Sequence, residues 1–421
     1  MHHFYRLLKT EIKHLAKSRL QAIQLQIQAK SCLKSKYRLF FSPTGEKAMN
    51  HEIGVFCPTL NVYGGGEYVA LAIANTLAQH NHPVTVFSST QIAPVEIRNF
   101  FGEPLHPKIR TIQQPTRFAP RGLLDFYQTI LHSYIAKNKC TTLIDAFSNC
   151  VYPWTNVSYI HYPHLNRSAF NPQFPYLSHP RLTQAGTFPE VLLEKNLVDY
   201  SKRLVLANSN YTAEEIQRFS GKPVEVLYPP FASKIGEIGK NTTKEPQENL
   251  VVTTSRLDEN KLLERIPYIA HQTDSSIHFA VIGRLCSQNT LERLQMLVKK
   301  LNLADRVKFY PNASAAQKIS LLQRAKLYLH TMVGEHFGIS IVEAMALGCV
   351  PIVHDSGGMR EFVPEQYRYS TIEVAAQKIS SEMAAWSPEK SEEAKQIAAG
   401  FSLEKFSLRF MTLFNQYFGC N

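Results

Sequence analysis

The chain has 421 residues and a formal net charge of +12, a length that predicts roughly two to three domains. Its apolar content of 44% and charged content of 19% are ordinary for a globular protein, and no apolar run approaches the ~18 residues of a membrane-spanning helix. The seven cysteines form no C-x-x-C pair, which argues against a zinc site or a disulfide framework and favours an intracellular compartment. A secretory signal is not expected, because lysines interrupt the apolar stretches near the N-terminus.

The first 50 residues carry most of the positive charge. They contain ten lysines and arginines against two glutamates, which is +8 of the total of +12. Residues 4–30 contain no proline or glycine and predict a helix with aliphatic side chains on one broad face and lysines away from it. Such a helix, over residues 1–36, could make peripheral contact with an anionic membrane, remain a solvated extension, or pack on the body. No nucleic-acid-binding motif accompanies the charge, so nucleic acid is not an expected partner.

From residue 51 onward the sequence alternates apolar runs with helix-length segments. The run HEIGVFCP predicts a buried strand, EYVALAIANTLAQH a helix and VTVFSS a second strand, which together make a βαβ unit. Between the first strand and the helix lie Gly64, Gly65 and Gly66, which would let a ligand approach the backbone and the N–H groups of the helix start. A tight turn alone would also account for these glycines. NAD is not expected, because Val69 replaces the third glycine of the dinucleotide fingerprint.

The run NVSYIHYPH predicts another strand, which brings His161 to its carboxyl end. Open α/β sheets place ligand-binding groups at the carboxyl ends of their strands. A lone histidine is more often structural than catalytic, but its place at a strand end, beside Tyr162 and Pro163, favours the two roles about equally.

A polar, glycine-bearing segment without periodicity, residues 234–249, is predicted to separate two domains. After it, five further apolar runs alternate with helix-length segments, from LVVTTS to CVPIV. The sequence therefore predicts an α/β fold with two doubly wound, Rossmann-like domains and a cleft between them. The predicted domains span residues 51–235 and 236–400, after an N-terminal extension over residues 1–50 and before a C-terminal helix over residues 401–421.

Two cations follow the first strand of the second predicted domain, in the loop SRLDENK. Arg256 and Lys261 would both leave the carboxyl end of that strand, where they could face one bound diphosphate. Basic residues in a loop are common on any protein surface, so the pair alone does not identify a ligand.

The segment GEHFGISIVEAMALG carries two glutamates eight residues apart. Glu343 fits a capping box in which Ser340 caps a helix that ends at Gly348, and that role would explain Glu343 without any ligand. Glu335 precedes the helix, at the carboxyl end of the strand KLYLHT, and its carboxylate would point into the cleft. The helix start would offer the N–H groups of residues 337–339 to a hydroxyl or phosphate oxygen.

The order of these motifs resembles that of the family 4 retaining glycosyltransferases, which have two Rossmann-like domains in the GT-B arrangement. The two glutamates match the E-x7-E signature of that family, and YGGGE, IHYPH, NSNYT, LYPP and SRLDENK extend the likeness over residues 51–420. The motifs YIHYP, LYPP and LHTMVGEHFG further resemble the ALG-type alpha-1,2-mannosyltransferases that extend lipid-linked oligosaccharides. Two departures are His336 and Ser255, at positions where the family often has glycine.

For the donor, the resemblance implies a nucleotide sugar, with GDP-mannose as the expected molecule. Gly64–Gly66 would let the diphosphate approach the first, acceptor-binding domain, and Arg256 and Lys261 of the second, donor-binding domain would neutralise it. This role would replace a metal ion, so neither a metal nor another cofactor is expected, and no D-x-D-type site is evident. Glu343 would reach the ribose hydroxyls, a role in tension with its capping box.

For the transferred sugar, the resemblance implies a site formed by Glu335 and the backbone of Phe337, Gly338 and Ile339. His161 would contact the same sugar near the reaction centre from the opposite domain. Glu335 and His161 would thus be the catalytic residues, and the leaving group and the acceptor would share one face of the sugar. The C-terminal helix would cross back to the first domain.

The sequence thus predicts a metal-independent retaining glycosyltransferase that moves mannose from GDP-mannose to a lipid-linked or other saccharide, peripherally bound at the cytoplasmic face of a membrane. The nearest alternative is a soluble polysaccharide or glycan synthase of the same fold that uses a UDP- or ADP-sugar. A second alternative is an epimerase or phosphorylase, although no lysine has a recognisable setting for pyridoxal phosphate. A third is a non-catalytic protein that binds nucleotide sugars.

Overall fold

The computed structural model describes most of the chain after its N-terminal segment, and these residues belong to one compact unit, His51–Asn421. The described residues are 52–62, 64–114, 123–162, 198–222, 224–241 and 248–419. The predicted N-terminal helix and its membrane contact lie outside the described residues, as does the end of the motif IHYPH. None of the helices that are described is long and apolar enough to cross a membrane.

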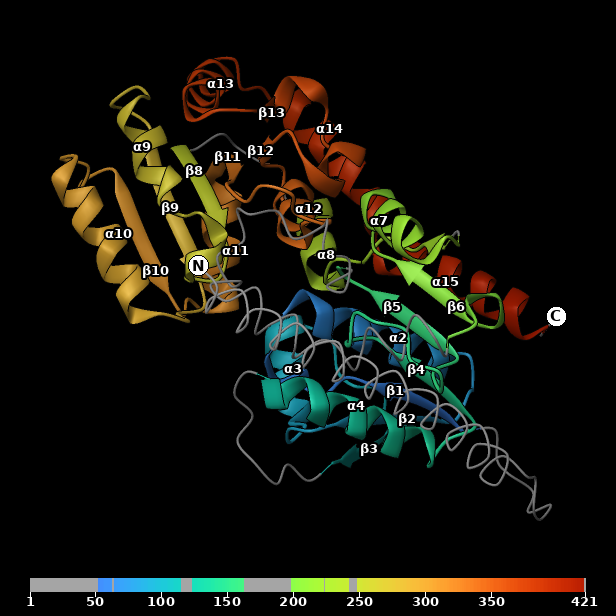
Figure 1. The fold of residues 1–421 in the computed structure, drawn as a ribbon. Coiled ribbons are helices and arrows are strands. Elements are labelled where there is room, and N and C mark those ends of the chain that lie inside the picture. Colours follow the sequence, from blue (N-terminus) through green and yellow to red (C-terminus); the bar gives the residue numbers. More distant parts are fainter. Residues whose placement is uncertain are drawn as a thin grey trace, which may run out of the picture. The chain divides into compact units, whose positions relative to one another are not determined.

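Seven parallel strands form the first sheet, in the order β3-β2-β1-β4-β5-β6-β7 (Figure 1). The strands are β1 (Ile53–Phe56), β2 (Val84–Ser88), β3 (Arg110–Gln113), β4 (Thr142–Asp145), β5 (Val157–Ile160), β6 (Leu204–Ala207) and β7 (Glu225–Val226). The helices between and after them are α2 (Gly65–Gln79), α3 (Pro94–Phe101), α4 (Leu123–Lys137), α7 (Asn210–Ser220) and α8 (Ser233–Asn241). Strands β1, β5 and β6 are buried at every position, which explains their short, continuous apolar runs.

Six parallel strands form the second sheet, in the order β10-β9-β8-β11-β12-β13. The strands are β8 (Glu248–Thr254), β9 (His278–Gly283), β10 (Val307–Pro311), β11 (Ala325–His330), β12 (Val350–His354) and β13 (Arg368–Tyr369). The accompanying helices are α9 (Arg265–His271), α10 (Gln288–Lys300), α11 (Ala315–Arg324), α12 (Ile339–Ala346), α13 (Ile372–Ala384), α14 (Pro388–Ala398) and α15 (Leu403–Phe418).

Both sheets are wound in the same way, which confirms the predicted fold class of two Rossmann-like sheets. Each starts at a central strand, extends outward on one side and then crosses to the other side. The strand order therefore reverses between β1 and β4, and again between β8 and β11. Open α/β sheets bind ligands at the carboxyl ends of the strands beside such a reversal, so the winding locates the candidate site.

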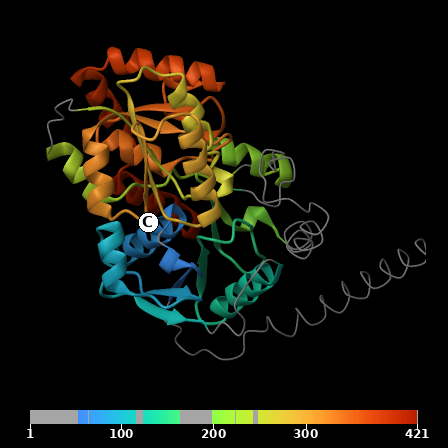
Figure 2. The same cartoon turned by 90° about the vertical axis from the view of Figure 1, so that its left-hand side faces the viewer.

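The last helix, α15, returns from the second sheet to the first, where its buried aromatic face packs against α2. The hydroxyl oxygen of Ser407 lies 2.8 Å from that of Thr76 in α2, and Arg409 pairs with Glu225 of β7 at 3.0 Å. Figure 2 shows the dark red α15 beside the blue α2. The C-terminal helix therefore ties the two sheets together.

Part of the predicted linker is helical. Residues Ser233–Asn241 form α8, whereas the sequence predicted a segment without periodicity over residues 234–249. Ile235 is buried, and a Cβ at Gly239 would lie only 2.0 Å from the carbonyl oxygen of Ala346. Glycine therefore lets α8 pack closely on α12, a tertiary contact that the polar composition of the segment does not reveal.

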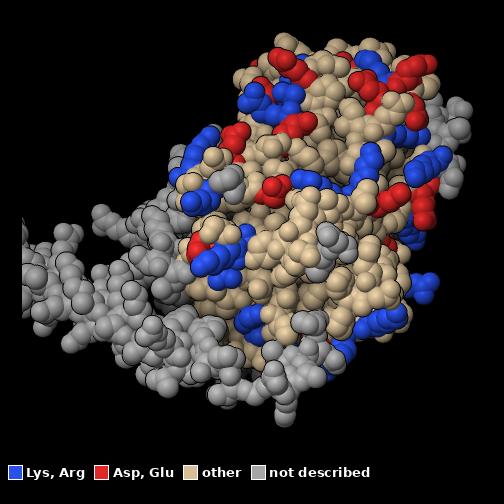
Figure 3. Space-filling model, turned by 90° about the vertical axis from the view of Figure 1, so that its right-hand side faces the viewer, with Lys and Arg blue, Asp and Glu red and all other residues tan. Residues whose placement is uncertain are grey.

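Lysine and arginine side chains are scattered over the face drawn in Figure 3, and acidic side chains are interspersed among them. The described residues of that face show no single continuous basic patch. This distribution agrees with a charge excess that belongs to the first 50 residues rather than to the body.

Candidate active site

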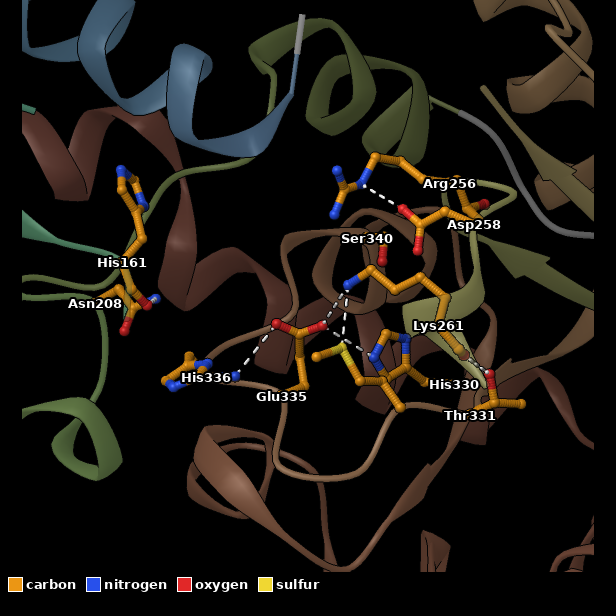
Figure 4. A network of polar contacts seen from close by, with 12 residues as sticks. His161, Asn208, Arg256, Asp258, Lys261, His330, Thr331, Glu335, His336 and Ser340 are labelled. Carbon is orange, nitrogen blue, oxygen red and sulfur yellow. Dashed lines mark hydrogen bonds and ion pairs between the residues drawn. The ribbon is translucent and has the colours of Figure 1, made fainter. Parts of the chain in front are cut away.

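The loops that follow β8 and β11 meet at the carboxyl edge of the second sheet (Figure 4). Lys261 lies in the loop after β8, and Glu335 lies in the loop after β11. The Nζ of Lys261 is 3.3 Å from Glu335 Oε2, and both side chains are 18% exposed. Thr331 joins the two loops, because its hydroxyl donates to the carbonyl oxygen of Lys261 at 2.9 Å. The fold thus brings together the cation and the carboxylate that the sequence singled out.

Glu335 is an ionised carboxylate in a mostly enclosed setting. Burial on its own would raise its pKa, but Lys261 and then His330 hold that pKa well below its usual range. Its Oε1 accepts a hydrogen bond from the backbone N–H of His336 at 3.2 Å. A carboxylate held in this way stays charged near neutral pH and can accept hydrogen bonds from sugar hydroxyls.

Glycines on two segments shape the loop around Glu335. Gly338 has a φ of +94°, a left-handed conformation that favours glycine. A Cβ at Gly357 would lie 2.2 Å from the carbonyl oxygen of Glu335, and one at Gly358 would lie 2.0 Å from that of His336. The N–H of Gly358 also donates to the Glu335 carbonyl at 2.9 Å. The SGG sequence after β12 therefore packs backbone against backbone on the Glu335 loop.

Arg256 lies at the rim of this group. Its side chain is 57% exposed, and its Nε lies 3.4 Å from Asp258 Oδ2. In Figure 4, Lys261 lies between Arg256 and Glu335. Of the two predicted cations, Lys261 is therefore the one that contacts Glu335, whereas Arg256 is paired within its own loop and is half exposed to solvent.

On the first sheet, the glycine turn before α2 comes close to α12 of the second sheet. Gly64 is the N-cap of α2. A Cβ at Gly65 would lie 2.8 Å from Ile339 Cδ1, and one at Gly66 would lie 3.3 Å from His161 Nε2. The glycines thus allow the helix start to contact two other predicted site residues, which a tight turn alone would not require.

His161 follows β5 directly, and several hydrogen bonds fix it. Its Nε2 lies 3.1 Å from the carbonyl oxygen of Ala146, which can only accept, so Nε2 carries the proton and Nδ1 remains an acceptor. Burial lowers the pKa of His161 to about 4, so the imidazole is neutral at pH 7. The side chain of Asn149 accepts from the His161 N–H at 2.7 Å, and that of Asn208 donates to the His161 carbonyl at 2.8 Å.

The start of α12 can offer a ligand its backbone rather than its side chains. Phe337 is 2% exposed, and its ring packs against those of Tyr228 and Phe362. Gly338 is the N-cap, and no side chain among the described residues caps the helix. The first N–H groups of α12 are therefore suited to a hydroxyl or phosphate oxygen.

The predicted capping box at Ser340 and Glu343 is wrong. Helix α12 begins at Ile339, so Ser340 is already inside it, and the Ser340 hydroxyl accepts from the hydroxyl of Tyr328 at 2.9 Å. Glu343 instead pairs with Lys318 of α11, with 2.6 Å between Oε2 and Nζ. A left-handed Gly348, with a φ of +82°, does follow the helix. Glu343 therefore has no capping role and is held by a cation.

The sequence analysis missed His330, the last residue of β11. The residue is 4% exposed, and its Nε2 lies 3.4 Å from Glu335 Oε2. Neither ring nitrogen forms a hydrogen bond with any residue that the structure describes. The available signal was its position at the carboxyl end of a strand beside the reversal of strand order.

His336 is a second residue that the sequence analysis noted only as a departure from a family pattern. Its ring centroid lies 5.9 Å from that of Tyr162, which follows β5, and 5.6 Å from that of Tyr211 in α7. Burial lowers its pKa to about 4. Figure 4 shows it on the His161 side of Glu335. A neutral imidazole therefore stands where the two sheets meet at the candidate site.

A metal centre is not evident in the described part of the chain, where no group of three or more His, Cys, Asp or Glu side chains is placed to hold an ion. The candidate site contains the ion pairs Lys261–Glu335 and Lys318–Glu343, the amides at the start of α12 and the neutral imidazoles of His161 and His336. These groups suit a ligand that carries both phosphate and hydroxyl groups.

The second sheet and helices α9 to α14 match the model of a known family. Residues 235–401 match the family described as glycosyl transferases group 1. These residues form a group 1 glycosyl transferase domain. The group 1 domain contains four of the candidate site residues that the sequence predicted from their side chains, namely Arg256, Lys261, Glu335 and Glu343.

Curated proteins similar to this chain share the name GDP-Man:Man(3)GlcNAc(2)-PP-Dol alpha-1,2-mannosyltransferase. The Caenorhabditis elegans protein is 22% identical over 381 residues, which are 77% of this chain and 80% of that protein. The Homo sapiens protein is 25% identical over 395 residues, which are 80% and 78% of the two chains. The Dictyostelium discoideum protein is 27% identical over 244 residues, or 51% of this chain. This chain spans less than half the length of the Dictyostelium discoideum, Candida albicans and Neurospora crassa relatives that it matches.

Solved structures share the fold of both sheets, including the group 1 domain. A sucrose-phosphate synthase from Thermosynechococcus elongatus has a TM-score of 0.65 at 16% identity, and the match covers 88% of this chain and 100% of that one. Anabaena HepE in complex with UDP and glucose has a TM-score of 0.64 at 16% identity, covering 86% and 99%. At these identities the likeness establishes the fold alone, and that fold is the predicted GT-B arrangement.

Proposed function

We propose that this chain is a retaining mannosyltransferase that moves mannose from GDP-mannose to a lipid-linked oligosaccharide without a metal ion. The shared name of its relatives supports the donor and the acceptor class. The observation that carries the proposal is the Lys261–Glu335 pair at the carboxyl edge of the second sheet. The pair joins a cation suited to a diphosphate and a carboxylate suited to sugar hydroxyls in one place.

In the proposed reaction, positive charge and amides hold the diphosphate. Because Lys261 lies beside Glu335, it is proposed to bind the phosphate next to the sugar. Arg256 can turn inward from the rim to bind the diphosphate, because its side chain is half exposed. The glycine turn Gly64–Gly66 is proposed to bring the N–H groups at the start of α2 toward the phosphate oxygens. These fixed charges and dipoles stabilise the nucleoside diphosphate as it departs. In other transferases a metal ion has this role.

The transferred sugar is proposed to lie between Glu335 and His161. Glu335 and the first amides of α12 bind its hydroxyls from one side, and His161 offers its Nδ1 as an acceptor from the other. The acceptor hydroxyl oxygen forms the new bond to the anomeric carbon on the face from which the diphosphate leaves with its bonding electron pair. The proton of that hydroxyl passes to the departing phosphate. The chain needs no protein nucleophile for this step.

The nucleoside is proposed to lie against Glu343. Lys318 occupies Oε2 of that carboxylate, so Oε1 is left to accept from the ribose hydroxyls. Because the side chain of Glu343 is only 15% exposed, its direction is set by the ion pair rather than by solvent.

Attachment to the cytoplasmic face of a membrane is proposed for residues 1–36, since that segment carries much of the net positive charge. The test compares the full chain with one lacking residues 1–45 in a vesicle co-sedimentation assay with anionic lipid. We expect the shortened chain to lose membrane binding and most transfer to a lipid-linked acceptor, while it keeps donor binding. Unchanged sedimentation and transfer would remove the segment from this role.

The donor assignment is tested by thermal denaturation with a panel of GDP- and UDP-sugars. We expect GDP-mannose to give the largest rise in unfolding temperature, because a ligand that binds only the folded state stabilises it by mass action. Arg256→Ala should abolish most of that rise. Arg324→Ala is the matched control, because Arg324 is similarly exposed and ion-paired, with Glu248, but lies at the opposite edge of the same sheet.

The same panel separates the proposal from its alternatives. A UDP-sugar that stabilises the chain most would overturn the mannose assignment and favour a glycan synthase of the same fold. Tight donor binding with neither transfer nor slow donor hydrolysis would favour a non-catalytic nucleotide-sugar binding protein.

A further inference from the structure

His330 is a buried, polar side chain without a hydrogen-bond partner at the centre of the candidate site. It is 4% exposed, and neither Nδ1 nor Nε2 forms a hydrogen bond with any described residue. Its backbone is fixed, since β11 pairs it with Val353 of β12 and the Tyr369 hydroxyl donates to its carbonyl at 2.8 Å. Buried polar groups in native proteins nearly always have hydrogen-bond partners, and the nearest candidate for this imidazole among the described residues is the Glu335 carboxylate.

The imidazole of His330 and the ammonium of Lys261 approach the same carboxylate oxygen. His330 Nε2 lies 3.4 Å from Glu335 Oε2, and Lys261 Nζ lies 3.3 Å from it (Figure 4). The His330 distance exceeds the ~2.7–3.2 Å of an N–H···O hydrogen bond. A small rotation of either side chain would close it. In the structure Lys261 is thus the counter-ion of Glu335, with His330 next to the same oxygen.

Donor binding would change this balance, and the inference here rests on the proposed function. A diphosphate carries more negative charge than one carboxylate, so it would draw Lys261 away from Glu335. Glu335 Oε2 would then lose its close cation, while the sugar hydroxyls depend on the direction of the carboxylate. His330 is the other described side chain in contact with the same oxygen.

We infer that His330 is a positioning residue that donates from Nε2 to Glu335 Oε2 when Lys261 turns to the diphosphate. The exchange keeps one side-chain hydrogen-bond donor on Glu335 Oε2 before and after the sugar nucleotide binds. It also explains why a polar side chain is buried at this strand end without a partner of its own. His330 touches neither the phosphate nor the sugar in this scheme, and it acts only through Glu335.

The first test separates this role from simple packing. His330→Ala should lower kcat for GDP-mannose hydrolysis or transfer by about tenfold to a hundredfold, the size of effect expected when a binding group is misplaced. The Kd for GDP, measured by calorimetry, should change by less than about twofold, because the phosphate contacts remain. His330→Asn, whose amide can also donate, should recover most of kcat. Glu335→Gln and His330→Ala together should cost little more than Glu335→Gln alone.

A matched control is provided by His132 of α4, which is equally buried at 4% and lies 2.7 Å from the hydroxyl of Ser89. His132→Ala should lower the unfolding temperature but leave kcat unchanged. Equal losses of kcat in the two alanine variants, or no recovery by asparagine, would overturn the inference. Absence of donor binding in the unaltered chain would instead reject the proposed function.

The second test needs no donor. The coupling between His330 and Glu335 is measured as a double-mutant cycle in urea midpoints, once with Lys261 and once with Lys261→Met. We expect the coupling to be clearly larger in the Lys261→Met background, where the imidazole is left as the side chain nearest to Glu335 Oε2 among the described residues. Equal coupling in both backgrounds would show that His330 does not take the place of Lys261. This result would hold whichever sugar nucleotide the protein uses.

Discussion

Lys318 and Glu343 form an ion pair that joins α11 to α12, with 2.6 Å between Nζ and Oε2. Their side chains are 24% and 15% exposed, so solvent screens the pair less than it would on the open surface. The pair occupies Oε2 of Glu343, and the proposed contact with the ribose would use Oε1. Glu343 is thus held by a neighbouring helix and not by the start of its own.

Lys318→Met keeps the aliphatic stem and removes the ammonium. We expect the free energy of unfolding to fall by about 1–3 kcal/mol, because Glu343 loses its partner in a mostly buried position. Binding of GDP should weaken by about tenfold, or ~1.4 kcal/mol, and its advantage over 2′-deoxy-GDP should shrink. Calorimetric titration with the two nucleotides checks this, and Lys318→Arg should retain the preference. Full ribose preference in the methionine variant would contradict the role given to Glu343.

Gly66→Ala places a methyl group 3.3 Å from His161 Nε2. We expect the imidazole to shift by a few tenths of an ångström and loosen its bond to the Ala146 carbonyl. Transfer activity should fall by roughly tenfold or more, since small displacements of groups at a reacting centre lower the rate strongly. Steady-state kinetics measures the loss. Gly400→Ala is the control, because a Cβ there meets nothing within 4 Å, and comparable losses in the two variants would refute the explanation.

Folding stability should depend on pH through His161. Burial lowers the pKa of His161 from 6.5 to about 4, so between these values the unfolded chain binds a proton that the folded chain does not. The contribution is fully present above about pH 6.5 and is lost as the pH falls toward about 4, with a size of up to about 3 kcal/mol. Urea unfolding across this range should show a flatter profile for His161→Asn. The exposed His271→Asn should keep the profile of the unaltered chain.

Glu361 connects the second sheet to the first. It ends the short helix η5 (Gly357–Glu361) and accepts from the N–H groups of Asn210 and Tyr211 at 3.0 and 2.8 Å and from the Tyr228 hydroxyl at 2.8 Å. Glu361→Ala should lower the free energy of unfolding by about 2 kcal/mol, since hydrogen bonds to a charged group are the strong ones. Small-angle scattering should give a larger radius of gyration. The neighbouring Arg360→Ala should change neither quantity, and a Glu361→Ala profile identical to it would argue against the connection.

The fold could be predicted because the buried strands read as continuous apolar runs. Strands such as β1 and β6 are covered on both faces, so every position is apolar or small and the run is unambiguous. Helix α8 was missed because its composition is polar, and its packing depends on the contact between Gly239 and the Ala346 carbonyl. That contact joins residues more than a hundred positions apart, and no local pattern encodes it.

The candidate site could be predicted where loop positions follow directly from strand order. Lys261 and Glu335 follow neighbouring parallel strands, so their loops had to meet. Ser340 was misread because Gly338 starts the helix earlier than a serine cap would. His330 and Lys318 were missed because each is defined by a partner that only the three-dimensional structure supplies.

The backbone contact between Gly358 and Glu335 has a mechanical consequence. The Gly358 amide donates to the Glu335 carbonyl at 2.9 Å, and Glu361, three residues further on, accepts from the N–H of Tyr211 at 2.8 Å. Both contacts are made by the same short helix, η5. A displacement of the Glu335 loop would therefore be transmitted through residues 358–361 to the hydrogen bonds between Glu361 and α7. We therefore expect substrate binding at Glu335 to be coupled to the contact between the second-sheet half and α7.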